Sequence, residues 1–448
     1  MAKPAPNKDL ERLYRESGWT LRQFAQAVNR VGTEQGTPLR YREPSVHQWL
    51  QGHKPREQVQ PVVLEALSRK LSRPISHREA GFSSHEGQPN TSSSTVGGLV
   101  DLGSHDMSPS RRAVLGASLF SVAMTIPNWP DVVGRMEAAQ TSTSLRIGSS
   151  EVDTVAAMTE RLSELDDEFG GRHARPMAAA FLVNTVAPYL KADARETVRK
   201  DMMGAAAFLC YLAGWMAVDE GLHGLAQKYY VKGLELAGAS GDHSTYCHIL
   251  RGMSVQAADL GHGNPAVRFA DAAAAVAPGA EHRMRAFLTG QQAHAYAVLG
   301  NRREAYRFLQ ESTSALEKAE SQTHTFGGYA PATLAYHESQ VRHELGDTEG
   351  SIKSLESHFR LRTRDNDSRR SGIRFTAMLA ERQLKLGHLE AACASWSQVL
   401  DDYPTVKSGR VDRSIATMRN SLRPHLRNSR ARDLHERART AMPAHLST

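Results

Sequence analysis

The chain has 448 residues, which exceeds the usual size of one domain and predicts two or more folded units. An apolar fraction of 40%, with Gly and Pro spread widely, excludes a collagen-like or wholly disordered protein. The three cysteines, Cys210, Cys247 and Cys393, lie too far apart for a CxxC metal or redox motif. They indicate a reducing compartment and buried thiols.

The net charge of +7 is distributed unevenly. Residues 1–80 carry 14 Lys and Arg against 8 Asp and Glu, and residues 405–448 carry 10 against 3. The remaining 31 basic and 37 acidic residues leave the middle of the chain mildly acidic. A small basic unit is typical of a protein that contacts a polyanion, because phosphate contacts provide most sequence-independent affinity. A basic surface that only contacts solvent is the alternative.

Residues 1–82 show short helical patterns with clear start and stop signals. Residues 9–17 predict a helix that Gly18 ends, and Thr20 followed by Gln23 has the spacing of a capping box. The apolar positions after Thr20 share one face of a second helix, and residues 59–71 predict a further helix that covers the others. The segment is therefore expected to form a small helical domain.

The stretch YREPSVHQWLQG at 41–52 predicts a short helix with two different faces. Val46, Trp49 and Leu50 recur at helical spacing and point inward, whereas the polar side chains between them point outward. Such a polar row fits a DNA major groove, where glutamine can pair with adenine, and flanking cations can hold phosphates. The candidate DNA-binding residues are Arg40, Arg42, Ser45, His47, Gln48, Gln51, Lys54 and Arg56.

This region resembles the repressor-like helix-turn-helix of the xenobiotic-response-element class. The pattern of that class appears here as Leu21, Ala25, Ser45, Val46, Trp49, Leu50 and Gly52. The turn between the two helices is expanded to about residues 32–43. With LDDEFGGRHAR at 165–175 and LAGWMAVDEGLHGLAQKYY at 212–230, most of the chain resembles actinobacterial transcriptional regulators of differentiation and secondary metabolism. The resemblance implies a sequence-specific DNA-binding regulator.

Residues 83–108 are rich in Ser, Gly and polar side chains, which predicts a flexible polar linker. Residues 109–150 follow as a connecting segment with an apolar helix. Ser110, Arg111 and Arg112 begin a stretch that resembles a twin-arginine export signal, but it is internal and its apolar run is too short to span a bilayer. An amphipathic segment docked on the helical body is the other interpretation, and we expect a cytoplasmic protein without a membrane partner.

From residue 151 the chain repeats itself. Segments such as LGNRREAYRFL at 299–309 share a Leu-Gly, a short polar turn and a small residue five positions after the glycine. The marker glycines are spaced by 40, 39, 46 and 41 residues and are Gly221, Gly261, Gly300, Gly346 and Gly387. This pattern resembles the tetratricopeptide repeat and predicts helical hairpins that stack into an α-solenoid with a concave surface. The basic tail at 410–442 predicts amphipathic closing helices broken near Pro424.

The block LDDEFGGRHAR has two interpretations. It can be a capped helix junction, or Arg175 with Asp166 or Asp167 can form a polar network that couples the linker to the repeats or lines a ligand groove. The weak candidates for partner or ligand binding are Asp166, Asp167, His173 and Arg175. GHGNPA at 261–266 follows a helix and not a strand, so it predicts a turn within a repeat. We expect no catalytic residues, no metal site, no cofactor and no enzyme activity.

The sequence thus predicts an all-α protein with a small repressor-like helix-turn-helix domain at 1–82 and an α-solenoid of tetratricopeptide-like hairpins at 151–448. We expect a homodimeric regulator that binds double-stranded DNA and takes a peptide or protein ligand in its repeat groove. One alternative is a helical-repeat scaffold or adaptor that does not bind DNA. An exported or membrane-tethered repeat protein is the other.

Overall fold

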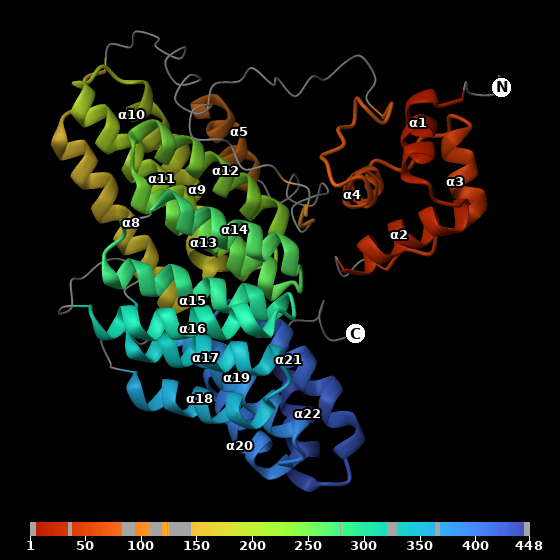
Figure 1. Ribbon diagram of the computed structural model, residues 1–448, viewed down its shortest axis with the longest axis vertical. Helices are drawn as coiled ribbons and strands as arrows, with labels where there is room; N and C mark the ends of the chain where they lie inside the picture. Colours follow the sequence, from red (N-terminus) through yellow and green to blue (C-terminus); the bar gives the residue numbers. More distant parts are fainter. Residues whose placement is uncertain are drawn as a thin grey trace.

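The structure is a computed structural model that describes residues 6–34, 38–82, 95–107, 119–122, 124, 145–277, 279–319, 329–362 and 368–442. Within these ranges the fold is helical (Figure 1), and the β-type pairing is limited to an isolated bridge between Arg146 and Asp193. The predicted all-α class is confirmed. Cys210, Cys247 and Cys393 are buried free thiols, as predicted.

The N-terminal unit contains α1 (Lys8–Ser17), α2 (Leu21–Glu34), α3 (Glu43–Leu50) and α4 (Gln60–Leu71). Gly18 ends α1 in a left-handed conformation. The Thr20 hydroxyl accepts a hydrogen bond from the Gln23 N–H at 3.2 Å, and the Gln23 side chain accepts from the Thr20 N–H at 2.9 Å. This is the predicted capping box. The apolar faces of the helices meet in one core, whose buried members include Leu10, Phe24 and Leu67.

Residues 95–107 correct the prediction of a flexible linker over 83–108. Thr95–Met107 form the helix α5, which packs against helices of the repeat body and buries Leu99 completely. The segment has too few apolar residues to form its own core, but Val96, Leu99 and Gly103 share one helical face that the body covers. The rest of the linker lies outside the described residues, as do Ser110, Arg111, Arg112 and the first part of the predicted apolar helix. The end of that predicted helix, residues 119–122, is described and is not helical, which corrects the prediction there.

The repeat body begins with α8 (Ser149–Phe169), α9 (Gly171–Phe181), the π-helical turn η2 (Leu182–Val186) and α10 (Ala187–Lys191). Helical hairpins then follow in chain order (Figure 1). Their paired helices are α11 (Glu196–Asp219) with α12 (His223–Ser240), α13 (His243–Asp259) with α14 (Gly263–Val276), α15 (His282–Val298) with α16 (Arg302–Glu317), α17 (Pro331–Glu344) with α18 (Thr348–Leu361), and α19 (Arg369–Lys385) with α20 (Leu389–Asp402).

Each marker glycine lies in the turn of one of these hairpins, with φ between 74° and 89°. The small residue five positions later is fully buried in every case, where the second helix begins to pack against the first; these residues are Ala226, Ala266, Ala305, Ser351 and Ala392. Glycine permits the left-handed turn, and the small side chain permits close helix packing. The predicted solenoid of helical hairpins is confirmed.

A closing hairpin completes the body. It consists of α21 (Gly409–Leu422), the short turn η5 (Arg423–His425) and α22 (Ser429–Ala441), and it follows η4 (Tyr403–Thr405). The helix breaks at Pro424, as the sequence predicts. The predicted apolar positions face inward, and the buried ones include Ile415, Met418 and Leu434. The closing helices bury the apolar face that the last repeat would otherwise expose.

The start and end of the solenoid contact each other directly. The Lys407 N–H donates to the Phe169 carbonyl at 2.7 Å, and the Ser408 hydroxyl donates to Asp219 at 2.8 Å. Arg172 forms an ion pair with Asp412 at 2.7 Å. The last hairpins therefore return to α8, α9 and α11, and the repeat body is closed on itself.

Residues 119–122, which we call the bridging segment, join the N-terminal unit to the repeat body. Phe120 is 4% exposed, and its ring stacks on His262 at 5.0 Å between centroids. Gln227 forms two hydrogen bonds with the Ser121 backbone, accepting from N–H at 2.8 Å and donating to the carbonyl at 2.9 Å. On the other side, the Val122 N–H donates to Glu65 of α4 at 3.0 Å. The segment thus contacts both parts of the molecule.

One helix in the described part of the chain, α11, is long and apolar enough to cross a membrane by length and composition. Of its apolar window, 72% is buried inside the fold. This burial is that of a central core helix, against which α12 packs.

Candidate functional site

The helix α3 has the two faces that its sequence predicts. Val46, Trp49 and Leu50 are buried, and the Trp49 ring packs edge-on against Tyr41 with centroids 5.0 Å apart. The opposite side carries His47 and the other polar residues. The burial of one face fixes the orientation of the helix, so its other face is presented to the surroundings.

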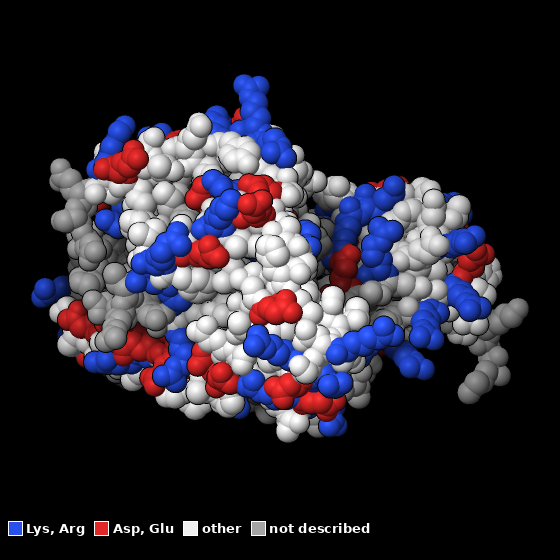
Figure 2. All heavy atoms as spheres, turned by 90° about the horizontal axis from the view of Figure 1, so that it is seen from below, with Lys and Arg blue, Asp and Glu red and all other residues white. Residues whose placement is uncertain are grey.

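The predicted DNA-binding residues are brought together on and around this exposed face. Ser45 is half-buried, and the other members are exposed: Arg40, Arg42, His47, Gln48, Gln51, Lys54 and Arg56. Among the described residues, no carboxylate forms an ion pair with any of the four cations in this set. Figure 2 shows Lys and Arg side chains spread over the smaller lobe of the molecule, and Figure 1 shows α3 on the side of the N-terminal unit away from the repeats.

The expanded turn before α3 is held by a contact that the sequence analysis missed. The Asn29 side chain of α2 accepts from the Tyr41 N–H and donates to the Tyr41 carbonyl, both at 2.8 Å. These two bonds anchor the backbone just before the helix begins. The half-buried Asn29 on α2 could have indicated a buried polar contact. Its partner could not be predicted, because Tyr41 lies 12 residues away in an irregular segment.

The block LDDEFGGRHAR contributes to two separate buried networks and not to one. Arg175 is fully buried and pairs with Asp106 of α5 and with Glu220, the latter at 2.7 Å. Asp166 and Asp167 pair instead with Arg370 of α19, at 2.8 and 3.3 Å. The predicted pairing of Arg175 with either aspartate is therefore wrong. The predicted link between linker and repeats is present, but Asp106 supplies it.

These residues do not line a ligand groove. Arg175 has no solvent-accessible surface, and Asp166 is almost as deeply buried. His173 is exposed, with its ring 5.6 Å from that of Phe169. The arrangement is that of a structural junction between α8, α9 and the later repeats.

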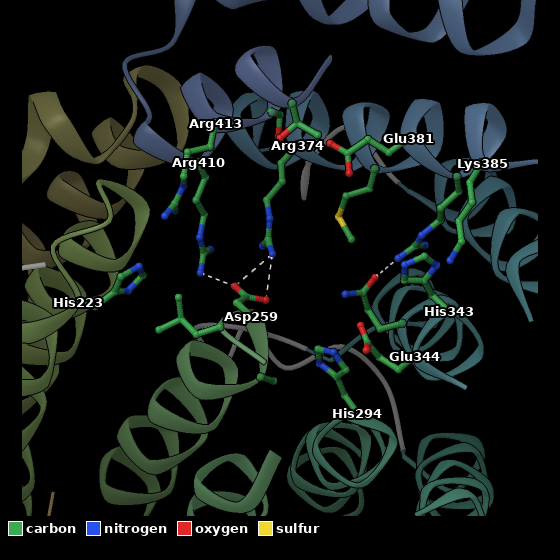
Figure 3. Close-up of a pocket in the computed structure, with 17 residues that line it drawn as sticks. His223, Asp259, His294, His343, Glu344, Arg374, Glu381, Lys385, Arg410 and Arg413 are labelled. Carbon is green, nitrogen blue, oxygen red and sulfur yellow. Dashed lines mark hydrogen bonds and ion pairs between the residues drawn. The ribbon is translucent and has the colours of Figure 1, made fainter. Parts of the chain in front are cut away.

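The sequence predicts a concave repeat groove, and a pocket of about 550 Å³ opens on this inner surface, lined by residues that were not among the predicted candidates. Its walls come mainly from the first helices of successive hairpins, α13, α15, α17, α19 and α21, with one residue from the start of α12 (Figure 3). The lining residues that carry charge or can acquire it are His223, Asp259, His294, His343, Glu344, Arg374, Glu381, Arg382, Lys385, Arg410 and Arg413.

Asp259 is the centre of an ion-pair cluster at one end of this pocket. Arg374 donates to both of its carboxylate oxygens at 3.2 Å, and Arg410 donates to one of them at 2.6 Å. Figure 3 shows these two arginines projecting from α19 and α21 toward Asp259 on the facing wall. Burial alone would raise the pKa of Asp259, but the two guanidinium groups outweigh it and lower the pKa.

The lining histidines are neutral in this environment. Burial and the nearby Arg413 lower the pKa of His223 to about 3. Burial also lowers the pKa of His294 to about 4, and burial with Arg382 lowers that of His343 to about 4. Burial is the main reason that these imidazoles stay neutral and add no positive charge to the pocket.

The signal for this pocket was partly present in the sequence. Arg374, Met378, Arg382 and Lys385 recur at the spacing of one helical face, and Arg410 and Arg413 form a similar pair on α21. Basic side chains on one face usually indicate a solvated surface, so the pattern alone did not distinguish an inner wall. The partner Asp259 lies 115 residues from Arg374, and only the fold brings the two together.

Comparison with known proteins gives limited matches. The domain family described as the SP15 N-terminal domain matches residues 10–83, which include α1 to α4 but not the repeats. The crystal structure of the P58(IPK) TPR domain is similar over 65% of this chain and 88% of that chain, at 16% sequence identity and a TM-score of 0.18. No curated protein matches the chain. The helical-repeat architecture described above rests on the helices of this chain.

Proposed function

We propose that the protein is a helical-repeat scaffold that binds a protein or peptide partner on the inner surface of its solenoid. The observation that carries this proposal is the pocket formed by the first helices of successive hairpins. Stacked repeats characteristically bind partners on such concave surfaces. The proposed role is therefore binding, and not catalysis.

Crosslinking of the full-length protein in its own cells, followed by mass spectrometry, tests the scaffold role. Crosslinks to a partner are expected at Lys385, on the pocket wall. They are not expected at Lys318, which caps the end of α16, or at Lys353 on α18, because these second helices contribute no residue to the pocket. Partner crosslinks confined to the second helices would contradict the proposal. Measuring both classes of site in one experiment supplies the internal control.

A second function, at the other end of the molecule, is duplex DNA binding by α3. It is favoured by the exposed polar row of Gln48 and its neighbours, on a surface that faces away from the repeats. The cations that flank this row form no ion pair with a described carboxylate. DNA binding by α3, together with the resemblance to transcriptional regulators described above, supports a sequence-specific regulator of differentiation or secondary metabolism in the cytoplasm. A homodimer would place two such helices on paired half-sites.

Two substitutions in the full chain test this function. Arg42→Ala should weaken retention on any duplex and reduce the salt dependence by about one phosphate contact. Gln48→Ala should reduce discrimination between sites, with a cost of about 1 to 3 kcal/mol at the preferred base. Arg12→Ala, at an exposed arginine of α1, is the matched control. If the unmodified protein shows no salt-sensitive affinity for any duplex, the scaffold role remains and the DNA function is excluded.

A further inference from the structure

The inner pocket holds more positive charge than its own carboxylates neutralise. Five Lys or Arg side chains and three Asp or Glu side chains are among its described lining residues. One of the three carboxylates, Asp259, is already shared by Arg374 and Arg410. The remaining cations, Arg382, Lys385 and Arg413, form no ion pair with a described residue.

Arg382 is buried and forms no ion pair with a described carboxylate. Arg382 is 3% exposed, and among the described residues its guanidinium donates to neutral groups, the Ser339 hydroxyl at 2.5 Å and the side-chain carbonyl of Gln340. The negative charges of Glu344 and Glu381 act on it without a direct ion pair. Burial lowers the pKa of Arg382 to about 10. A buried cation is costly unless an anion compensates it, so a ligand carboxylate beside Arg382 would be favourable.

His223 provides an independent observation that points to a ligand. Its side chain is buried, with 7% exposed, and its Nε2 has no hydrogen-bond partner among the residues that the structure describes. The Gln256 amide nitrogen donates to the His223 carbonyl at 2.9 Å and lies 3.4 Å from the His223 Nδ1. Because this nitrogen is a donor, Nδ1 accepts and Nε2 carries the proton. Figure 3 shows the ring directed toward the pocket, where its free N–H can donate to a ligand oxygen.

The lining distinguishes between classes of anionic ligand. Apart from imidazoles, no aromatic ring is among the described lining residues, so a nucleobase would have nothing to stack on. The pocket also has acceptors, Glu344 and Glu381, which a simple phosphate would not use. A peptide uses both kinds of group, because its carboxylates pair with the cations while its backbone N–H groups donate to the acceptors.

We propose that this pocket binds an acidic peptide segment, with Arg382, Lys385 and Arg413 pairing with its carboxylates and His223 donating to it. The proposal rests on the scaffold role and specifies the chemistry of the partner. The volume of about 550 Å³ accommodates a short extended segment and excludes a folded domain. The acidic side chains of the segment would pair with the lining cations that form no ion pair with a described residue.

Fluorescence polarisation with the full-length protein tests the proposal. A labelled hexaglutamate peptide is expected to bind at least about tenfold more tightly than hexaglutamine, and increasing salt should weaken its binding. The double variant Lys385→Ala with Arg413→Ala should reduce hexaglutamate affinity by about tenfold. Both side chains are exposed and make no ion pair with a described residue, so their removal should leave the fold intact.

The matched control is Arg303→Ala with Lys318→Ala, which removes the same charge from exposed positions on α16 and at its C-terminal cap. It should bind hexaglutamate as the unmodified protein does. Equal affinity for the acidic and neutral peptides, or equal losses in the two double variants, would overturn the proposal. So would displacement of hexaglutamate by inorganic phosphate at concentrations near the peptide Kd, because the site would then be a simple anion site.

A third variant, Arg382→Gln, tests the buried cation, with circular dichroism to verify its fold. It should lose affinity for hexaglutamate while the α3 surface keeps its affinity for duplex DNA. Failure of this peptide proposal is distinguishable from failure of the scaffold role. Partner crosslinks on the pocket walls without preference for acidic peptides would leave the scaffold role standing and exclude the acidic ligand.

Discussion

At the scale of single residues, the balance between burial and neighbouring charges determines which groups of the inner pocket carry charge. Arg374 and Arg410 keep Asp259 ionised, whereas His294 on the neighbouring wall stays neutral. The two groups are close enough that the charge of Asp259 favours protonation of His294, but burial has the larger effect and lowers the pKa. This imidazole makes the stability of the body depend on pH.

His294→Gln should reduce that pH dependence. The folded-state pKa of about 4 lies below the ordinary value of 6.5, so between these pH values the unfolded chain binds the proton and the folded chain does not. Its contribution to stability is therefore present above pH 6.5 and is lost as pH falls toward 4. Lowering the pH from about 7 to about 5 should cost about 2 kcal/mol at this residue.

Urea unfolding of the full chain at the two pH values measures this difference. The unmodified protein should lose about 2 kcal/mol more than His294→Gln. His282→Gln, at an exposed histidine on the same helix, is the control. An identical pH dependence in the unmodified protein and His294→Gln would show that His294 is protonated equally in both states.

The residue-scale predictions from sequence succeeded where the cause is local. Val46 and Trp49 are inward-facing because apolar side chains at helical spacing share a face, and no distant residue is needed to infer it. Arg175 and Arg370 have buried partners that come from other parts of the chain. Sequence spacing gives no measure of such distances, so the pairing of Arg175 was predicted incorrectly.

At the scale of helices, the hairpins depend on a small side chain at each crossing. Ala305 is fully buried near the start of α16, where this helix packs against α15. Its counterparts in the other hairpins are alanine or serine, so every crossing has the same requirement. A larger side chain would force the two helices apart.

Ala305→Leu should destabilise the repeat body by about 1 to 3 kcal/mol through overpacking. Ser314→Leu is the matched control, because the same residue is introduced at an exposed position of the same helix. Thermal unfolding of the two variants separates the effect of close packing from that of added hydrophobicity. Equal melting temperatures would mean that the hairpin opens to accept the leucine without cost.

Element prediction failed for α5, and the reason is physical. Its sequence contains many Gly and polar residues, and its helical face of Val96 and Leu99 packs against α9, α12, η2 and α10 of the repeat body. The hairpins were predictable because each contains its own turn and crossing residue. A helix that depends on a preformed surface has no equivalent signal in its own sequence.

At the scale of the whole molecule, the bridging segment determines how the N-terminal unit is placed. The Phe120 ring stacks on His262 of the repeat body. Two residues later, the Val122 N–H donates a hydrogen bond to the Glu65 carboxylate of α4. Burial raises the pKa of Glu65, and its carboxylate is also paired with Arg69 at 2.8 Å. The contact is therefore a specific polar and aromatic junction.

Phe120→Ala should release the N-terminal unit from the body. The buried ring contributes about 3 kcal/mol or more, by analogy with core Phe→Ala substitutions. Small-angle X-ray scattering should show a larger radius of gyration for this variant. Phe169→Ala, at an exposed ring on α8, should leave the radius unchanged. An unchanged radius in Phe120→Ala would show that other contacts hold the two parts together.

The closure of the solenoid has a consequence for how the protein can change over evolutionary time. Open repeat arrays tolerate the gain or loss of whole units, because each unit contacts only its neighbours. Here Ser408 must meet Asp219, 189 residues away, and Arg370 must meet Asp166, 204 residues away. Duplication or deletion of one hairpin would separate these partners. The contacts between the first and last hairpins therefore constrain the number of repeats.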